Sequence, residues 1–215
     1  MGKVRTLEQL QEILDEEMGW RIKEIGAFRI SSKSAGDKSR HFVRAGIALL
    51  YAHWEGFIKN ASERYLEFVA SRGLTYGQLS SCFAVFGLKG KLNNLVESKK
   101  SRLNVEAFEF ITQELGNKAK LQLADAINTE SNLTSTVFAN IARSVGIQID
   151  KYETKFNLID ESLVNRRNKV AHGEFLDVNN KEFEDLVSEI LLLMRWYKTD
   201  IQNAASLEAY KFQDE

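Results

Sequence analysis

The segment VRAGIALLYAHWEGFIKNASERYLEF, residues 43–68, decides the fold. Its large apolar side chains recur in steps of three and four residues: Val43, Ile47, Leu50, Trp54, Phe57, Ala61, Tyr65 and Phe68. This spacing places them on one face of an α-helix, and the segment therefore predicts a long helix with one buried face. Asp37 is a candidate N-cap for this helix, and Gly73 marks its expected end.

The remaining segments also favour helices. Thr6-Leu7-Glu8-Gln9 has the pattern of a capping box, and the apolar spacing after it predicts a first helix over about 7–30. The chain contains no proline, the residue that most strongly interrupts a helix, and its absence favours long helices. Further helices are expected over about 76–88 and 105–115, over 133–145 before Gly146, from a cap at Asp160 to His172, and from Asn179 onward.

These elements predict an all-α helical bundle in one domain, residues 1–215. Residues 98–130 are a candidate insertion within this domain. The basic run Lys99-Lys100-Ser101-Arg102 is interpreted as a loop, and residues 116–130 fit a loop, a helix or a small hairpin. The candidate insertion 98–130 would interrupt the bundle without adding a second hydrophobic core.

Composition excludes several classes of protein. The 29 basic and 30 acidic residues balance, so any contact with RNA must be local. The single cysteine, Cys82, excludes an internal disulfide and a cysteine-based zinc site, and the start of the chain does not resemble a signal peptide. No apolar run approaches the ~18 residues of a membrane span. We therefore expect a cytoplasmic protein that does not enter a membrane.

Polar residues interrupt a buried stripe near residue 167. The apolar row Ile159, Leu163 is followed by Arg167, and the adjoining row Val164 is followed by Asn168 and His172. An arginine near a helix end usually caps carbonyl groups or pairs with a carboxylate, and a lone histidine is usually structural. Residues five apart on a straight helix lie about 140° apart, so a long side chain, a distorted turn or a second subunit would have to bring Arg167 and His172 together.

The string Asn165-Arg166-Arg167-Asn168-Lys169-Val170-Ala171-His172-Gly173-Glu174 resembles the hallmark of the HEPN superfamily, an arginine followed after four to six residues by histidine. Its form is similar to that of the MAE-type prokaryotic branch. The resemblance extends to residues 49–59, to Leu158-Ile159-Asp160 and to 196–204. It covers roughly residues 40–80 and 130–210.

This resemblance implies a bundle with four to five core helices and a homodimer that cleaves RNA without a metal ion or cofactor. It also implies a role as the effector of a toxin–antitoxin or antiphage system, with an antitoxin or other defence-system protein as partner. His172 would exchange protons, Arg167 would stabilise the charge of the phosphorane, and Asn168 would orient the histidine or the phosphate. Arg166, Glu174 and Glu55 are supporting candidates, the last through an ion pair with an active-site arginine. Glu174 stands where some relatives carry a modified tyrosine. The alternatives are a non-catalytic helical module that binds RNA, nucleotide or protein, and a structural dimerisation domain.

Other motifs give no competing function. His53 and Trp54 lie in the long apolar helix and are interpreted as structural, and Glu55 has Lys59 one turn away for a surface pair. His41 has no visible companion. The sequence has no Gly-rich phosphate loop, no HExxH and no nucleophile elbow, and the three histidines are too scattered to indicate a metal site.

Overall fold

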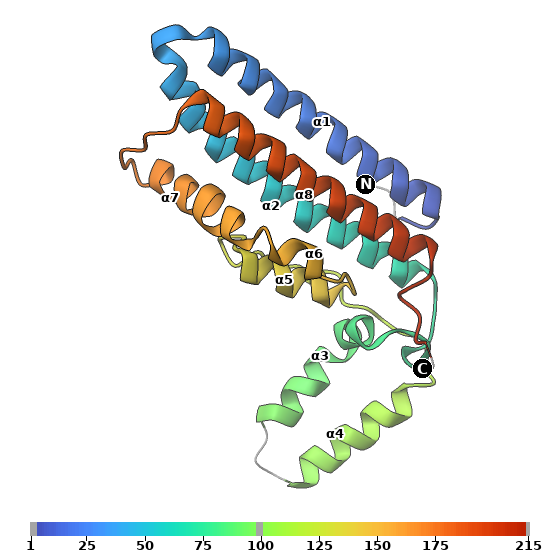
Figure 1. The fold of residues 1–215 in the computed structure, drawn as a ribbon. Coiled ribbons are helices and arrows are strands. Elements are labelled where there is room, and N and C mark those ends of the chain that lie inside the picture. Colours follow the sequence, from blue (N-terminus) through green and yellow to red (C-terminus); the bar gives the residue numbers. More distant parts are fainter. Residues whose placement is uncertain (1–3, 98–100, 214–215) are drawn as a thin grey trace.

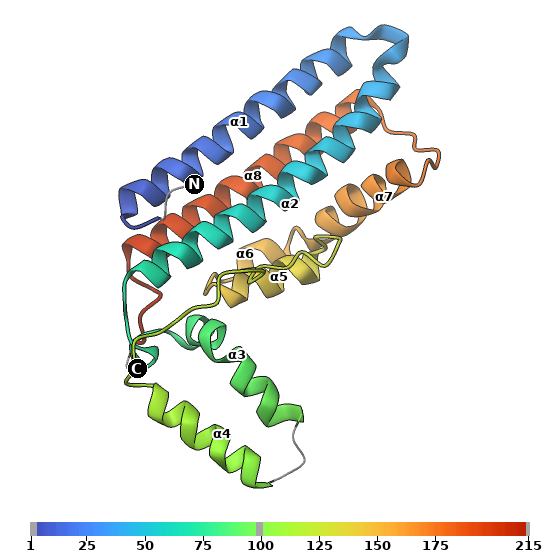
Figure 2. The ribbon, with the colours of Figure 1, turned by 180° about the vertical axis from the view of Figure 1, so that it is seen from behind.

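The computed structural model describes residues 4–97 and 101–213, and it is a helical bundle (Figures 1 and 2). Three long helices lie side by side: α1 (Leu7–Ser34), α2 (Ser39–Ser71) and α8 (Asn180–Ser206). A second layer against α2 contains α5 (Ser135–Ser144), α6 (Asp150–Glu153), the π-helix η3 (Leu158–Asn165) and α7 (Arg166–Ala171). The expected all-α bundle is confirmed. No helix in the described part of the chain has a stretch both long and apolar enough to cross a membrane.

Capping explains where the long helices begin. The Thr6 side chain accepts a hydrogen bond from the Gln9 backbone N–H at 3.2 Å, and Gln9 Oε1 accepts one from the Thr6 backbone N–H at 3.3 Å. These two bonds confirm the capping box of α1. Asn179 and Glu182 form the same box at the start of α8. The prediction for Asp37 was wrong. Asp37 lies in a short 3-10 turn, η1 (Gly36–Lys38), because the chain needs this tight turn to reverse between α1 and α2.

The prediction that Asp160 caps a helix was also wrong. Asp160 lies inside η3, and its carboxylate accepts hydrogen bonds from the Ser135 backbone N–H at 2.7 Å and from Ser135 Oγ at 2.6 Å. It therefore satisfies the first turn of α5, whose N-cap is Thr134. Gly146 ends α5 as expected, with φ +72° and a backbone bond from Ile147 N–H to the Ala142 carbonyl.

A helical hairpin lies at the end of the bundle where α2 ends. It contains α3 (Ser81–Glu97) and α4 (Ser101–Glu114), preceded by the short turn η2 (Tyr76–Gln78), and it extends away from the long helices in both views (Figures 1 and 2). The predicted helices at 76–88 and 105–115 therefore begin and end elsewhere, and Arg102 lies in α4 rather than in a loop. Lys99 and Lys100 lie outside the described residues. The interpretation of 98–130 as an insertion stays a prediction.

Aromatic side chains fill the centre between the layers. Phe138 of α5 packs against Trp54 of α2, Tyr152 of α6 and Tyr197 of α8, with ring centroids 5.0–5.7 Å apart. All four side chains are fully buried. The Tyr197 hydroxyl exchanges a hydrogen bond with Ser62 Oγ at 2.6 Å, which satisfies two buried polar groups. This core fixes α2 relative to the second layer.

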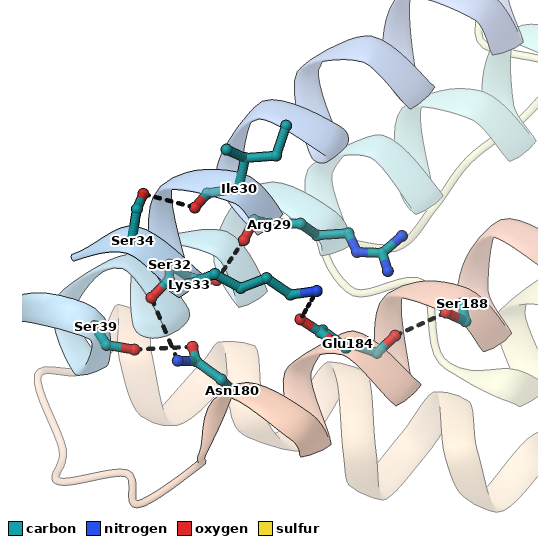
Figure 3. Close-up of polar contacts among 9 residues, drawn as sticks. All are labelled: Arg29, Ile30, Ser32, Lys33, Ser34, Ser39, Asn180, Glu184 and Ser188. Atoms are coloured by element: carbon teal, nitrogen blue, oxygen red, sulfur yellow. Dashed lines mark hydrogen bonds and ion pairs between the residues drawn. The ribbon is translucent and has the colours of Figure 1, made fainter. Parts of the chain in front are cut away.

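Polar contacts tie the start of α2 to its neighbours (Figure 3). Ser39 Oγ donates to Asn180 Oδ1 at 2.8 Å, and Asn180 Nδ2 donates to the Ser32 carbonyl at 3.3 Å. Lys33 pairs with Glu184 at 2.7 Å. The end of α1, the start of α2 and the start of α8 are thus held together at one corner of the bundle.

Candidate functional site

Gly173 determines where His172 lies. Gly173 has φ +73°, its N–H bonds to the Val170 carbonyl, and the Glu174 N–H bonds to the Lys169 carbonyl. This is a Schellman motif, which glycine favours because its positive φ is strained for other residues. His172 is consequently the C-cap of α7, and its side chain is exposed. The glycine that ends the helix therefore presents the imidazole to solvent.

Arg167 lies over an aromatic ring of the neighbouring long helix. Its guanidinium carbon is 3.8 Å from the centroid of the Tyr51 ring, in contact distance for a cation–π interaction. Tyr51 is buried, and its hydroxyl accepts a hydrogen bond from the Leu133 backbone N–H at 2.7 Å. Burial raises the pKa of the Tyr51 hydroxyl above its ordinary value, so the ring stays neutral. A fixed, neutral ring thus orients the guanidinium.

Hydrogen bonds complete the fixation of Arg167. One Nη donates to Asn168 Oδ1 at 2.9 Å, and the other donates to the Ser131 carbonyl at 3.4 Å. Nε is buried without a hydrogen-bond partner, and no carboxylate pairs with Arg167 anywhere in the described ranges. Each Nη carries two hydrogens, so the guanidinium has more donors than these two hydrogen bonds use, and the Tyr51 hydroxyl is a further partner for one of them. Of the two structural roles usual for such an arginine, the contact with a carbonyl is present at Ser131 and the carboxylate partner is absent from the described residues.

The three central candidates come together only in part. Asn168 touches Arg167, and the Asn168 carbonyl accepts from the His172 backbone N–H at 2.9 Å. Among residues 4–97 and 101–213, however, no hydrogen bond or ion pair involves the His172 side chain, and none joins it to Arg167. Within one chain, therefore, no hydrogen bond joins the Arg167 and His172 side chains in the described residues.

The supporting candidates lie apart from Arg167. Arg166 points to α8, where its Nη2 lies 3.6 Å from the Glu182 carboxylate. Glu174 contributes its backbone carbonyl, which accepts from Arg44 Nη1 at 2.8 Å. Glu55 forms no ion pair with an arginine or with Lys59 in the described part of the chain, and its supporting role at the site stays a prediction. Its carboxylate instead acts on Tyr51, whose pKa it raises further.

His53 belongs to a buried polar cluster between α1 and α2, on another face of α2. Its Nδ1 lies 3.4 Å from Arg21 Nη1 and its Nε2 lies 3.0 Å from the Glu24 carboxylate. Arg21 is itself buried and pairs with Glu17 at 2.8 Å. Burial, with the charge of Arg21, lowers the pKa of His53. A neutral His53 that accepts from Arg21 and donates toward Glu24 fits this geometry, and its role is to join two helices.

Sequence reasoning missed the residues that hold Arg167. Tyr51 was read only as part of the segment resembling HEPN proteins, and Ser131 lies in a loop whose structure was left open. A tyrosine just beside the buried seam of a long helix was the one available signal. The contacts themselves join segments far apart in the sequence, which no local pattern specifies.

Comparison with models of protein families gives a match. A family model described as RiboL-PSP-HEPN matches residues 16–203, which is most of the chain. No curated protein and no solved structure matches. Within the described residues no group of three or more His, Cys, Asp or Glu side chains is placed to share a metal ion.

Proposed function

The chain belongs to the RiboL-PSP-HEPN family, a HEPN-type domain family, and from this premise we propose that it is a metal-independent endoribonuclease. Arg167 and His172 are the proposed catalytic residues, and Asn168 positions the arginine. Membership of the MAE-type branch stays a prediction, as does location in the cytoplasm.

One observation carries the proposal: a guanidinium held over the Tyr51 ring, with two hydrogen bonds from its Nη atoms and no carboxylate partner in the described residues. A planar fork of this kind matches two oxygens of a phosphate. An arginine with a purely structural role would be expected to pair with a carboxylate as well, and Arg167 does not within the described residues. The exposed His172 on the turn that ends the same helix supplies an imidazole, a group that can accept or donate a proton.

The proposed reaction is an internal transesterification. His172 accepts the proton of a ribose 2′-hydroxyl, and the 2′-oxygen forms a bond to the adjacent phosphorus. Arg167 stabilises the charge that develops on the phosphoryl oxygens. The bond from phosphorus to the 5′-oxygen then breaks, and an imidazolium or water donates a proton to that oxygen. The products are a 2′,3′-cyclic phosphate and a 5′-hydroxyl.

We further propose that the working unit is a homodimer. Because the two side chains do not meet within one chain, a second copy related by twofold symmetry would place an arginine and a histidine across the interface. The resemblance to prokaryotic defence proteins supports a role as the effector of a toxin–antitoxin or antiphage system. A partner protein that covers the exposed His172 would restrain such an effector.

Cleavage of a labelled single-stranded RNA by purified wild type and variants tests the proposal. His172→Asn and Arg167→Ala should each lower the rate by roughly 10²–10⁴, the range for loss of a positioned acid–base or charge-stabilising group. Arg143→Ala is the control, because Arg143 is an exposed arginine at the end of α5. Folded variants that cleave like the wild type would refute the assignment.

The second candidate is an RNA-binding domain without cleavage. It is favoured by the absence, in the described residues, of any contact that orients the His172 imidazole. Wild-type protein that binds single-stranded RNA, yet leaves it intact in the dimeric state, would establish this alternative.

A further inference from the structure

A hollow with basic and aromatic side chains adjoins the end of α7. It has a volume of about 390 Å³, and Arg40, His41 and Arg44 of α2 line one side. The other side is the segment 173–176 that directly follows His172. Neither the expected site nor the family match includes an assignment for these α2 side chains. The hollow therefore begins where the proposed catalytic turn ends.

The hollow and Arg167 lie along the same face of α2. Arg167 contacts Tyr51, the Glu174 carbonyl contacts Arg44, and Asp177 contacts Arg40, so the chain after Arg167 runs antiparallel to α2. Arg44 precedes Tyr51 by seven residues, two helical turns, which is about 10 Å at 1.5 Å per residue. A strand with one phosphate at Arg167 would therefore reach the hollow with a neighbouring nucleotide.

The charges at the hollow suit a phosphate. Arg44 donates one N–H to the Glu174 carbonyl and pairs with no carboxylate in the described ranges. Arg40 pairs with Asp177 at 3.0 Å, but both side chains are more than half exposed, at 53% and 73%, so the pair is weak and exchangeable. The carboxylate of Glu174 also borders the hollow and would lower its affinity for an anion. Glu174 and Asp177 thus oppose the binding of an anion. Replacing either carboxylate by a neutral side chain should raise the affinity, whereas replacing an arginine should lower it.

Phe175 adds a surface for a base. It is 75% exposed, although a large apolar side chain gains from burial, and the Arg40 guanidinium carbon lies 5.5 Å from its ring centroid. Single-stranded nucleic acids are bound where a basic groove lies beside an exposed aromatic ring on which a base stacks. Contacts of Ser39, the residue before Arg40, fix this end of α2 (Figure 3). The basic side chains therefore project from a rigid support.

We propose that Arg40, Arg44 and Phe175 form a subsite for the nucleotide next to the scissile phosphate of single-stranded RNA, with His41 beside it. The inference rests on the proposed nuclease function. Arg44 and Arg40 bind the phosphate, and the ring of Phe175 stacks on the base. The subsite makes the protein specific for single strands, because a duplex does not release a base for stacking.

The affinity for an RNA that cannot be cleaved tests the subsite independently of catalysis. The probe is a short fluorescent single-stranded RNA with 2′-O-methyl groups, which lacks the nucleophile, and the readout is anisotropy. Arg44→Ala should weaken binding about tenfold or more and reduce the slope of log K against log salt by about 0.7. Phe175→Ala should weaken binding by about 5- to 100-fold without changing that slope. Asp177→Asn should strengthen binding, because it frees Arg40.

Two control variants make the same substitutions, arginine to alanine and phenylalanine to alanine, at exposed positions outside the proposed subsite. Arg102 and Phe108 are exposed residues of α4, with 86% of the Arg102 side chain and 63% of Phe108 accessible. Arg102→Ala and Phe108→Ala should leave affinity within about twofold. A hybridised duplex probe should not distinguish Phe175→Ala from wild type.

The outcomes separate this inference from the nuclease proposal. Wild type that binds the probe through Arg44 and Phe175, but does not cleave unmodified RNA, supports the subsite and refutes the nuclease. Cleavage that is unchanged in Arg44→Ala and Phe175→Ala, with unchanged probe affinity, overturns the subsite alone. Loss of the dimer in Phe175→Ala, measured by sedimentation with probe affinity per folded chain unchanged, assigns the ring to the subunit interface and also overturns it.

Discussion

The stacking of Arg167 on Tyr51 predicts a measurable coupling energy. In a double-mutant cycle, Tyr51→Leu removes the ring and Arg167→Met removes the charge while keeping apolar length. Cation–π pairs contribute about 0.5–1 kcal/mol when exposed and about 2 kcal/mol when desolvated. Tyr51 is buried and the Nε of Arg167 is buried, so we expect a coupling of about 1–2 kcal/mol from urea unfolding. In a chain of this length that corresponds to roughly 2–8 °C in Tm.

Two controls isolate the ring from the hydroxyl. Tyr51→Phe should lose about 1–3 kcal/mol of stability, because the buried Leu133 N–H loses its acceptor, yet it should keep the coupling to Arg167. The cycle of Arg40 with Phe175, an exposed pair at 5.5 Å, should give at most about 0.5 kcal/mol. If the losses of unfolding free energy in Tyr51→Leu and Arg167→Met add up to that of the double variant within about 0.3 kcal/mol, the ring does not hold the guanidinium. This account of the site would then be refuted.

Four further predictions follow from the fold and the site. Sedimentation should show a homodimer, and mixing inactive His172→Asn with inactive Arg167→Ala should restore cleavage if one working site takes its residues from both subunits; a strictly monomeric active enzyme would contradict this. Cleavage should persist in excess EDTA and leave 2′,3′-cyclic ends, and rescue by magnesium would argue against the mechanism. The lowered pKa of His53 means that the unfolded chain binds more protons, so stability should fall as pH decreases from 7.5 through 6.5, and His53→Gln should flatten this slope in thermal melts. Asp160→Ala should cost about 1–3 kcal/mol by orphaning the buried Ser135 donors, whereas Asp160→Asn, which keeps an acceptor, should cost less.

The sequence predicted the elements whose signals are local. Long apolar rows and capping boxes located α1, α2 and α8, because periodicity over many turns and a cap within four residues are both encoded along the chain. Gly146 was likewise correct as a helix end, and so was the end of the predicted helix at His172, which Gly173 follows with a positive φ. The position of His172 at the end of its helix followed directly.

Predictions from the sequence were wrong where a residue distant in the chain determines the structure. Asp160 is of a residue type common at N-caps, but its carboxylate accepts hydrogen bonds from Ser135, which lies 25 residues earlier. The turn around Asp160 is a π-helix, whose wider turns shift every later side chain relative to 3.6-residue spacing. Arg167 thereby reaches Tyr51, a contact that neither the apolar row nor the family hallmark specifies.

The placement of the site on α2 explains why a helix so apolar also carries arginines. One face of α2, with Leu50, Trp54 and Phe57, is fully buried in the bundle. On another face Tyr51 and Arg44 are seven residues apart, which returns nearly to the same direction around the helix. Burial of the first face fixes the second, so Tyr51, which orients Arg167, and Arg44, which we propose binds the neighbouring phosphate, keep a constant separation. Such a support would let loops, and a second subunit in the proposed dimer, vary around the proposed site without moving its charged groups.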